Sequence, residues 1–308
     1  MFYEKLTQHS TSQQITMKVS GFTFVRNAIK FDYPIVEAIT SILPLCDEMI
    51  VAVGNSDDDT LGLIKGIDSP KIKIIETVWD DTLREGGKVL AVETNKALAA
   101  VSKDADWCFY IQGDEVVHEQ YLPNIRQAMQ DNLDNQEVDG LLFKYLHFYG
   151  SYHYVADAQR WYRQEIRIIR NKSIITSYRD AQGFRTVDDK KLNVRWIEAY
   201  IYHYGWVKSP ELQKEKLKSS INFWANEEVA SSVRKRYDDH FDYSEIDSLT
   251  TFHGTHPEVM QARIERVNWQ FDYDIREKKL SLKNRFRAWV EKITGWRIGE
   301  YKNFKVIK

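Results

Sequence analysis

Residues 106–115 read DWCFYIQGDE, and this stretch decides the fold. Its first part, Asp106 to Gln112, is apolar almost throughout, which is the pattern of a strand buried on both faces. Gly113, Asp114 and Glu115 follow directly, so carboxylates stand where the strand ends. Strands buried on both faces are typical of parallel sheets covered by helices. The stretch therefore predicts an α/β fold with acidic side chains at the carboxyl end of a central strand.

Strands and helices alternate along the chain upstream of this stretch. Strand patterns occupy 17–24, 46–53 and 71–78, and helical patterns occupy 33–45, 60–67 and 87–101. In the first helix, Ile35, Ile39 and Ile42 recur at the spacing of one helical face. This alternation with short connections predicts a Rossmann-type, mostly parallel sheet flanked by helices.

The pattern changes beyond Gly140. Strands are expected over 141–148, 164–170 and 199–204, separated by longer aromatic loops. From Pro210 onward the chain is charged and helical, and its apolar stripe is formed by Leu212, Leu217, Ile221 and Trp224. We therefore predict an α/β domain over 1–208 and a helical C-terminal extension over 209–308.

Composition narrows the class of protein. The 308 residues carry a formal net charge of -2, which does not favour a nucleic-acid binder. Cys46 and Cys108 stand in apolar surroundings outside any CxxC or Cys/His pattern, so buried thiols are expected rather than a disulfide framework or a zinc site. The N-terminus lacks the pattern of a secretory signal, and no apolar run approaches the roughly 20 residues of a membrane span. We therefore expect a cytoplasmic protein.

Polar side chains gather in the loops that follow three of the predicted strands. Arg26 and Asn27 follow the first strand, the acidic loop 55–59 follows the second, and 112–115 follows the strand quoted above. Ligands of an open parallel sheet bind beyond the carboxyl ends of its strands, so these loops should converge on one crevice. Carboxylates, amides and one arginine suit a phosphate ester held by a divalent cation. The sequence has no GxGxxG or GxxxxGK[ST] motif, which argues against a dinucleotide or P-loop enzyme.

Four motifs, taken in order, carry a resemblance to a known family. They are FVRN at 24–27, VGNSDDDT at 53–60, the helix from GGK at 86–88 to NKA at 95–97, and YIQGDE at 110–115. Together they resemble the family-2 glycosyltransferases with the GT-A fold. Three later blocks look like a bacterial subgroup that decorates surface polysaccharide, namely EIRIIRN at 165–171, RDAQGFR at 179–185 and YHYGWV at 202–207.

The resemblance implies a reaction. A nucleotide-sugar donor would give its sugar, with inversion at the anomeric carbon, to a saccharide or lipid-linked saccharide acceptor. A divalent metal, Mg²⁺ or Mn²⁺, would bridge the two phosphates and stabilise the leaving nucleoside diphosphate. The first domain, 1–208, would then be the nucleotide-sugar-binding and catalytic domain.

Residue roles follow from the same resemblance. Asp57 stands where the family contacts the base or ribose, with Asn55 and Asp58 as alternates. Lys88 stands near the base or phosphate, and Arg26 would grip phosphate. Asp114 matches the second acid of the DxD metal motif, and His203 would supply another metal or phosphate contact. Asp180 is the candidate for the base that deprotonates the acceptor hydroxyl, with Asp188 and Asp189 as second choices.

The sequence departs from the family pattern at Gln112, which replaces the first acid of DxD. An amide oxygen is a weak metal ligand without charge, so the metal would depend on Asp114, His203, the phosphates and water. Glu115 would be aimed away from Asp114 by the alternation of a strand. This departure keeps a second hypothesis open, a non-catalytic nucleotide- or glycan-binding module. A nucleotidyltransferase, the third, normally needs a Gly-rich basic loop that 22–30 does not supply.

Each candidate has a structural alternative. The acidic residues 57–59 would cap the next helix, and Asp114–Glu115 would cap a helix over 116–120. His203 would be a core histidine, Lys88 a surface charge and Asp180 a turn residue.

The C-terminal tail has the pattern of a basic amphipathic helix. Apolar residues recur at helical spacing, namely Leu282, Phe286, Trp289, Val290, Ile293 and Trp296. Basic residues surround them at Lys278, Lys279, Lys283, Arg285, Arg287, Lys292 and Arg297. This pattern is typical of a helix that lies in a membrane interface, here through 278–297 at the inner face of the membrane. A helix packed on the catalytic domain with its lysines in water is the alternative.

Overall fold

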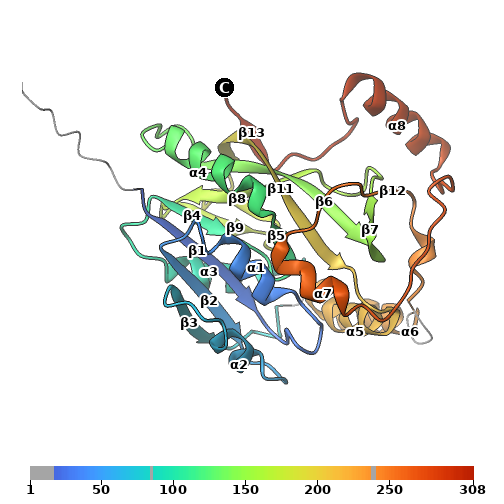
Figure 1. The fold of residues 1–308 in the computed structure, drawn as a ribbon, viewed down its shortest axis with the longest axis horizontal. Helices are drawn as coiled ribbons and strands as arrows, with labels where there is room; N and C mark the ends of the chain where they lie inside the picture. Colours follow the sequence, from blue (N-terminus) through green and yellow to red (C-terminus); the bar gives the residue numbers. More distant parts are fainter. Residues whose placement is uncertain (1–16, 84–85, 237–240) are drawn as a thin grey trace, which may run out of the picture.

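The computed structural model describes residues 17–83, 86–236 and 241–308. The N-terminal residues considered above for a secretory signal lie outside this description. Within the described residues, one mixed 11-stranded sheet runs through the molecule, and its main path has the order β12-β7-β6-β8-β4-β1-β2-β3 (Figure 1). β11 extends the sheet beside β6 and also pairs with β5 and β13.

The first half of the chain forms the predicted strand–helix units. In order, these elements are β1 Val19–Val25, α1 Ile35–Ile42, β2 Glu48–Gly54, α2 Thr60–Lys65, β3 Ile72–Thr77, α3 Lys88–Ala99 and β4 Trp107–Tyr110. β1 pairs in parallel with β2 and β4, and β2 pairs in parallel with β3. Every predicted element in this half is present, with ends that differ by a few residues. The carboxyl ends of all four strands therefore meet at one edge of the sheet.

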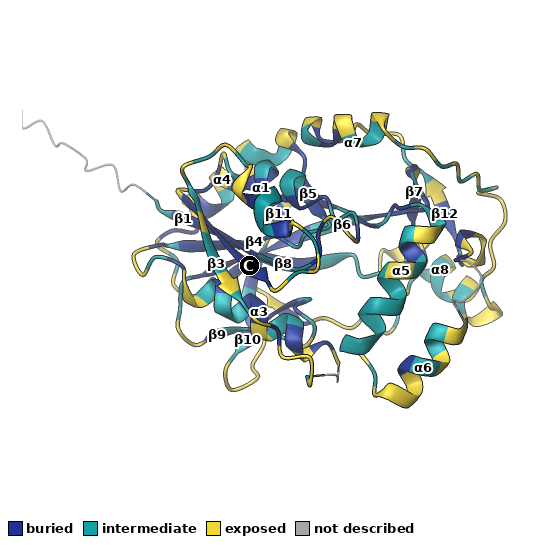
Figure 2. Cartoon of the chain, turned by 90° about the horizontal axis from the view of Figure 1, so that it is seen from below, coloured by how far each residue is buried: buried dark blue, intermediate teal, exposed yellow. Residues whose placement is uncertain are grey.

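β4 is the central strand and is buried on both faces, as predicted. Trp107, Cys108, Phe109 and Tyr110 have no exposed surface. Trp107 and Phe109 face a core shared with α1, whereas Cys108 and Tyr110 face a second core shared with α3. Figure 2 shows the sheet in the buried colour between α1 on one side and α3 on the other. Both cysteines are buried free thiols, which confirms the prediction made for them.

Beyond β4 the sheet becomes mixed. The next elements are β5 Glu115–Val117, η1 Glu119–Tyr121, α4 Leu122–Asp131, β6 Gly140–Tyr149, β7 Ser151–Ala156, β8 Gln164–Arg170 and β11 Leu192–Trp206, and β9 Ile175–Tyr178 with β10 Gly183–Thr186 forms a separate ribbon. β8 is antiparallel to both β4 and β6, while β11 runs parallel to β6. The fold is thus a mixed α/β sheet with parallel core strands flanked by helices.

One structural alternative is wrong. The residues after Asp114 do not form a capped helix, because Glu115–Val117 is β5, antiparallel to β11. Glu115 is fully buried and forms a bidentate pair with Arg167, with Nε and Nη2 each 2.7 Å from a carboxylate oxygen. The side chain therefore points away from Asp114, as the strand alternation predicted.

The C-terminal part contains helices and two further strands. These elements are α5 Pro210–Ser220, η2 Ile221–Phe223, α6 Glu227–Arg236, η3 Tyr243–Glu245, β12 Leu249–Thr251, η4 Glu258–Met260, α7 Gln261–Glu265, α8 Leu282–Thr294 and β13 Phe304–Val306. β12 joins the edge of the sheet at β7, and β13 pairs with β11. Helix α5 ends before Ile221 and Trp224, so the predicted apolar stripe is divided between a helix and a 3₁₀ turn. No helix in the described ranges has the length and hydrophobicity needed to cross a bilayer.

Candidate functional site

A cavity of about 640 Å³ opens at the carboxyl ends of β1, β2, β3 and β4. Its walls also include the Asp180 loop, the end of β11 and helix α5 with the turn that follows it. Six of the predicted site residues line it together, namely Arg26, Asp57, Gln112, Asp114, Asp180 and His203. Asn55, Asp58 and Lys88 are not among the lining residues, nor are the second-choice bases Asp188 and Asp189. The predicted convergence of three loops on one crevice is present.

Asp57 reaches the cavity through a network with the loop after β1. Its backbone N–H donates to Asn27 Oδ1 at 2.7 Å, and its carboxylate accepts from Asn27 Nδ2 at 3.3 Å and from Lys30 Nζ at 3.0 Å. The hydrogen bond from Lys30 is the main cause that lowers the pKa of Asp57. Asn27 itself has a positive φ of 56°, a conformation that side chains other than glycine adopt rarely. This loop therefore presents an ionised carboxylate at the rim.

The neighbouring acids have local roles. Asp59 accepts from the N–H of Gly62 at 3.0 Å and caps α2, which confirms the capping alternative for this residue. Asp58 accepts from the N–H groups of Thr60 and Lys30 at 3.0 and 2.7 Å. Asp58 thus joins the two loops, and Asp57 alone of the three lines the cavity.

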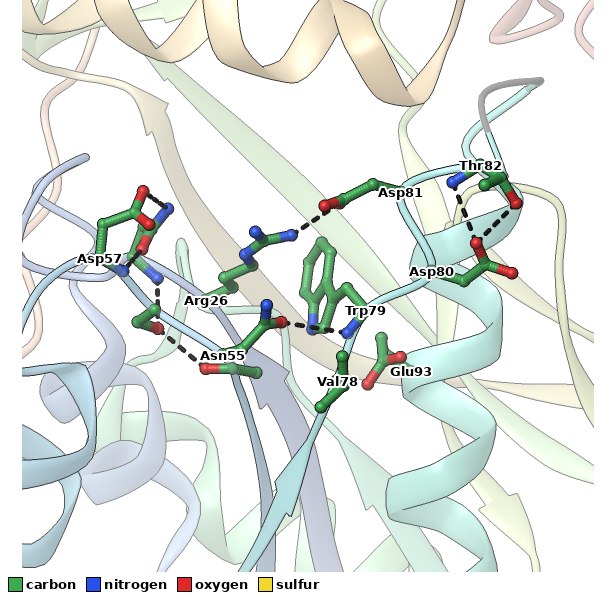
Figure 3. Close-up of polar contacts among 12 residues, drawn as sticks. Arg26, Asn55, Asp57, Val78, Trp79, Asp80, Asp81, Thr82 and Glu93 are labelled. Carbon is green, nitrogen blue, oxygen red and sulfur yellow. Dashed lines mark hydrogen bonds and ion pairs between the residues drawn. The ribbon is translucent and has the colours of Figure 1, made fainter.

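Arg26 lies beside the loop after β3 (Figure 3). Its Nη1 donates to Asp81 at 2.9 Å, and its guanidinium lies 5.5 Å from the centre of the Trp79 ring. Its Nε is buried and has no hydrogen-bond partner among the described residues. Asn55 accepts from the N–H of Trp79 at 3.1 Å, so Asn55 shapes this loop from outside the cavity. The side chain of Arg26 keeps one buried N–H available for an anionic ligand.

Asp114 and His203 lie together on the cavity floor. Asp114 Oδ2 is 3.7 Å from His203 Nε2 and 3.2 Å from Lys216 Nζ, which also donates to the carbonyl of Gly205 at 2.9 Å. Burial raises the pKa of Asp114, but effects of the opposite sign, the largest of them the positive charge of Lys216, outweigh burial and bring this pKa to about 2. A Cβ at Gly205 would lie 2.5 Å from Asp114 Oδ2 and 2.8 Å from His203 Nε2. Only glycine leaves this space open.

A second histidine sets the tautomer of His203. His147 Nε2 lies 2.7 Å from the carbonyl oxygen of Tyr162, which can only accept, so this nitrogen carries the hydrogen. His147 Nδ1 must then accept from His203 Nδ1, 3.1 Å away. The assignment, inferred from the hydrogen-bond partners, leaves the lone pair of His203 Nε2 facing Asp114. Burial lowers the pKa of both histidines, which keeps the rings neutral.

These features fit a divalent cation. A carboxylate and a neutral imidazole nitrogen are ordinary ligands of such ions, and the hydrogen bond to His147 is the outer support such a histidine usually has. The ammonium of Lys216 shows that a cation is stabilised beside Asp114. Within 17–83, 86–236 and 241–308, no group of three Asp, Glu, His or Cys side chains is placed to hold a metal. Asp114 and His203 would therefore need oxygens from a bound phosphate or from water.

The loop that carries Asp180 has an unusual backbone. Arg179 and Ala181, on either side, have positive φ values of 55° and 63°. Non-glycine residues in this region store strain and cluster at functional sites. A Cβ at Gly87 would lie 2.5 Å from Asp180 Cβ, so the glycine before α3 lets this loop approach. Burial raises the pKa of Asp180.

Gln112 holds this loop in place. Its Nε2 donates to the carbonyl of Ala181 at 3.1 Å. An aspartate at this position could accept but not donate, so glutamine supplies a donor that Asp lacks. Gln112 thus has a structural role in this chain, as the donor that fixes the loop of Asp180.

The sequence analysis missed several cavity residues. Trp79 and Asp81 follow β3, and the rule applied to the other strands would have found them. Lys216 on α5 lines the cavity, and His147 on β6 contacts His203 from outside the lining. Neither had such a signal, because each reaches its place only through the packing of its element. The side chain of His203 is only 11% exposed, as that of a core histidine would be, but its unprotonated Nε2 faces Asp114, which favours a ligand.

Comparisons with known proteins find only distant similarity. No family model matches the chain, and no curated protein sequence matches it. TarS 1-349 from S. aureus superimposes with a TM-score of 0.37 and 15% identity over 71% of this chain and 69% of that one, but only 44% of a longer TarS chain is covered. Another TarS structure contains UDP. Glucosyl-3-phosphoglycerate synthase from Mycobacterium tuberculosis, in complex with Mn²⁺, UDP and glucosyl-3-phosphoglycerate, superimposes with a TM-score of 0.29 and 22% identity. The match covers 44% of this chain and 45% of that one. These values are too low to assign a function, so function is inferred from the site's own residues.

Proposed function

We propose that this chain is a glycosyltransferase that transfers a sugar from a nucleoside-diphosphate sugar to a hydroxyl of a saccharide or lipid-linked saccharide. The observation that supports it most directly is the content of one cavity. Three features line it: an arginine with a buried, unpaired N–H, the Asp114–His203 pair suited to a cation, and the strained loop of Asp180, a carboxylate of raised pKa. We assign the chain to the GT-A type of family 2 as part of this proposal, with 1–208 as the catalytic domain and 209–308 as its extension.

The donor would lie across the carboxyl ends of β1, β2 and β4. Asp57 would accept hydrogen bonds from the ribose or base, and the buried Nε of Arg26 would donate to a phosphate oxygen. Asp114 and His203 would hold Mg²⁺ or Mn²⁺, which when bound neutralises charge on the diphosphate leaving group. Asn55, Asp58 and Lys88 stay weaker predictions for donor contact, since they lie outside the lining.

Asp180 is proposed as the base. Its carboxylate would accept the proton of the acceptor hydroxyl while that oxygen bonds to the anomeric carbon and the bond to the diphosphate oxygen breaks. A single displacement of this kind inverts the anomeric centre. A raised pKa makes the carboxylate a stronger base, and general-base catalysis contributes about 10²- to 10⁴-fold to the rate. Gln112 would keep the base in position through Ala181.

The test is donor turnover by the full chain. Nucleoside-diphosphate sugars are incubated with the protein in the presence of Mn²⁺ or of a chelator, and the released nucleoside diphosphate is measured. Calorimetry with the free nucleoside diphosphates runs in parallel. We expect cation-dependent binding and slow donor hydrolysis, which Asp114→Asn removes. Binding without any turnover would support the non-catalytic binding module instead, and absence of both would contradict the proposal.

A further inference from the structure

Helix α8 exposes a continuous apolar stripe. Leu282 is 84% exposed, Phe286 and Trp289 are each 59% exposed, and Ile293 is 62% exposed. Residues at these spacings share one face of a helix. Trp296, just after the helix, is 62% exposed as well, and none of the residues of α8 is buried. Large side chains gathered in this way on a surface mark an interaction site.

The opposite face of α8 holds the helix on the protein. Glu291, half a turn of the helical wheel from the stripe, accepts from Arg163 Nη1 at 3.2 Å and from Arg297 Nε at 3.0 Å. Arg297 Nη1 in turn donates to the carbonyl of Trp161 at 2.6 Å. Figure 1 shows α8 at the periphery of the molecule, away from the central sheet. Polar contacts hold the inner face of α8 on the domain, and the apolar stripe is directed outward. The helix is therefore packed by its polar side and not by its apolar stripe.

Basic residues flank the stripe. Lys283, Arg285 and Lys292 are exposed on the same helix. From Arg276 to the C-terminus the chain has eleven Lys or Arg and three Glu, a difference of +8, although the whole chain has a net charge of -2. An aromatic and aliphatic face bordered by cations complements the interface of a bilayer that contains anionic lipids.

We propose that α8 binds the surface of an anionic membrane, with its axis parallel to the bilayer plane and Phe286, Trp289 and Ile293 inserted at the headgroup level. A second copy of this chain is a poorer occupant, because a two-fold contact through the stripe would bring the flanking cations of the two copies together. The proposal does not depend on sugar transfer. The described residues contain no membrane-spanning helix. Binding through α8 would bring the chain to the surface where lipid-linked molecules reside.

Vesicle flotation of the full chain tests the proposal. One set of vesicles contains equal parts phosphatidylglycerol and phosphatidylcholine, and the other contains phosphatidylcholine alone. We expect the protein to float with the first set and not with the second, and added salt to weaken the association. Phe286→Ser with Trp289→Ser should reduce binding by more than about 10-fold, and Lys283→Gln, Arg285→Gln and Lys292→Gln by about 5-fold each.

A matched control removes an exposed aromatic side chain elsewhere. Trp196 on β11 is 43% exposed, so Trp196→Ser should leave flotation unchanged. Thermal melting and circular dichroism verify that each variant folds. The proposal would be overturned if the protein bound neutral vesicles as strongly as anionic ones. It would also be overturned if the double variant floated as well as the wild type. A concentration-dependent dimer that the double variant abolishes would overturn it as well.

Discussion

Two buried carboxylates at opposite ends of the parallel strands have a pKa lowered to about 2, but for different reasons. At the amino end, burial raises the pKa of Glu48, and hydrogen bonds outweigh it. Ser20 Oγ and Lys73 Nζ donate at 2.5 Å, and the N–H and hydroxyl of Ser102 donate at 2.7 and 2.8 Å. At the carboxyl end, burial also raises the pKa of Asp114, and the positive charge of Lys216 is the main cause that lowers it. Among the described residues, the hydrogen bond to this carboxylate comes from Lys216 Nζ.

The two ends therefore differ in how far their polar groups are satisfied. Both oxygens of Glu48 have donors within the protein. Around the cavity, by contrast, Arg26 Nε and both amide atoms of Gln213 are buried without a partner in the described part of the chain. Buried polar groups are normally paired, so unpaired ones are either costly or reserved for a ligand. The amino end thus satisfies its polar groups within the protein, whereas the carboxyl end leaves buried polar groups available, as the proposed binding of a donor requires.

Asp180→Asn should produce the largest change. The amide keeps the size of the side chain and one acceptor oxygen but cannot take the proton, so transfer should slow by about 10² to 10⁴. Affinity for the nucleoside diphosphate, measured by calorimetry, should stay within about twofold, because Asp180 is proposed to act on the acceptor and not on the donor. Loss of nucleotide binding together with activity would show that the residue holds the donor or the loop instead.

Asp114→Asn should lower transfer by about 10² to 10³, because the charge beside the leaving group is removed. Unlike the preceding variant, this one should also weaken nucleotide binding in the presence of Mn²⁺. Because the side chain of Lys216 is only 15% exposed, loss of the charge that pairs with it should also lower the free energy of unfolding, so transfer is measured where circular dichroism shows the variant to be folded. If the folded variant transfers sugar at the wild-type rate, Asp114 is not part of the proposed site.

Glu48→Gln, at the amino end, should lower stability and leave nucleotide binding and transfer unchanged. A pKa lowered from 4.5 to about 2 corresponds to about 3 kcal/mol of stabilisation. Since the folded-state pKa is below the unfolded one, this stabilisation is present above about pH 4.5 and is lost as the pH falls through about 2. Urea denaturation at pH 7 and pH 3 should show the wild type losing stability in acid and the variant losing less. If the variant also binds nucleotide differently at pH 7, Glu48 affects the cavity and the two ends are not independent.

The sequence was sufficient to predict the parallel half of the fold, because local apolar runs and short connections indicate β4 and the strands before it. It also brought Arg26, Asp57 and Asp114 to one edge, since that edge follows from strand direction. It could not predict that Asn55 and Asp58 turn to neighbouring loops, because loop hydrogen bonds decide side-chain direction. Nor could it place Lys216, which depends on how α5 packs across the cavity.

His147→Phe tests the finest feature of the carboxyl end. A phenyl ring preserves the packing beside Tyr145, Trp161 and Tyr162 but cannot accept the hydrogen of His203 Nδ1. His203 is then free to change tautomer or rotate, and loss of such an outer contact typically weakens metal affinity by about 10- to 100-fold. Calorimetry should show this loss for nucleoside diphosphate in the presence of Mn²⁺ and a much smaller one with a chelator.

His118→Phe is the control for that variant. His118 is also a buried histidine, but its Nε2 contacts Thr255 at 2.8 Å and its Nδ1 accepts from the N–H of Gln120 at 3.3 Å. Neither partner lines the cavity, whereas His203, the partner of His147, does. It should bind nucleotide like the wild type in both conditions. If His147→Phe weakens binding equally with and without Mn²⁺, the ring stabilises the cavity wall rather than orienting a ligand. The two ends would then still differ in their charges. The hydrogen bond from His203 to His147 would no longer count as a feature that prepares the carboxyl end for a ligand.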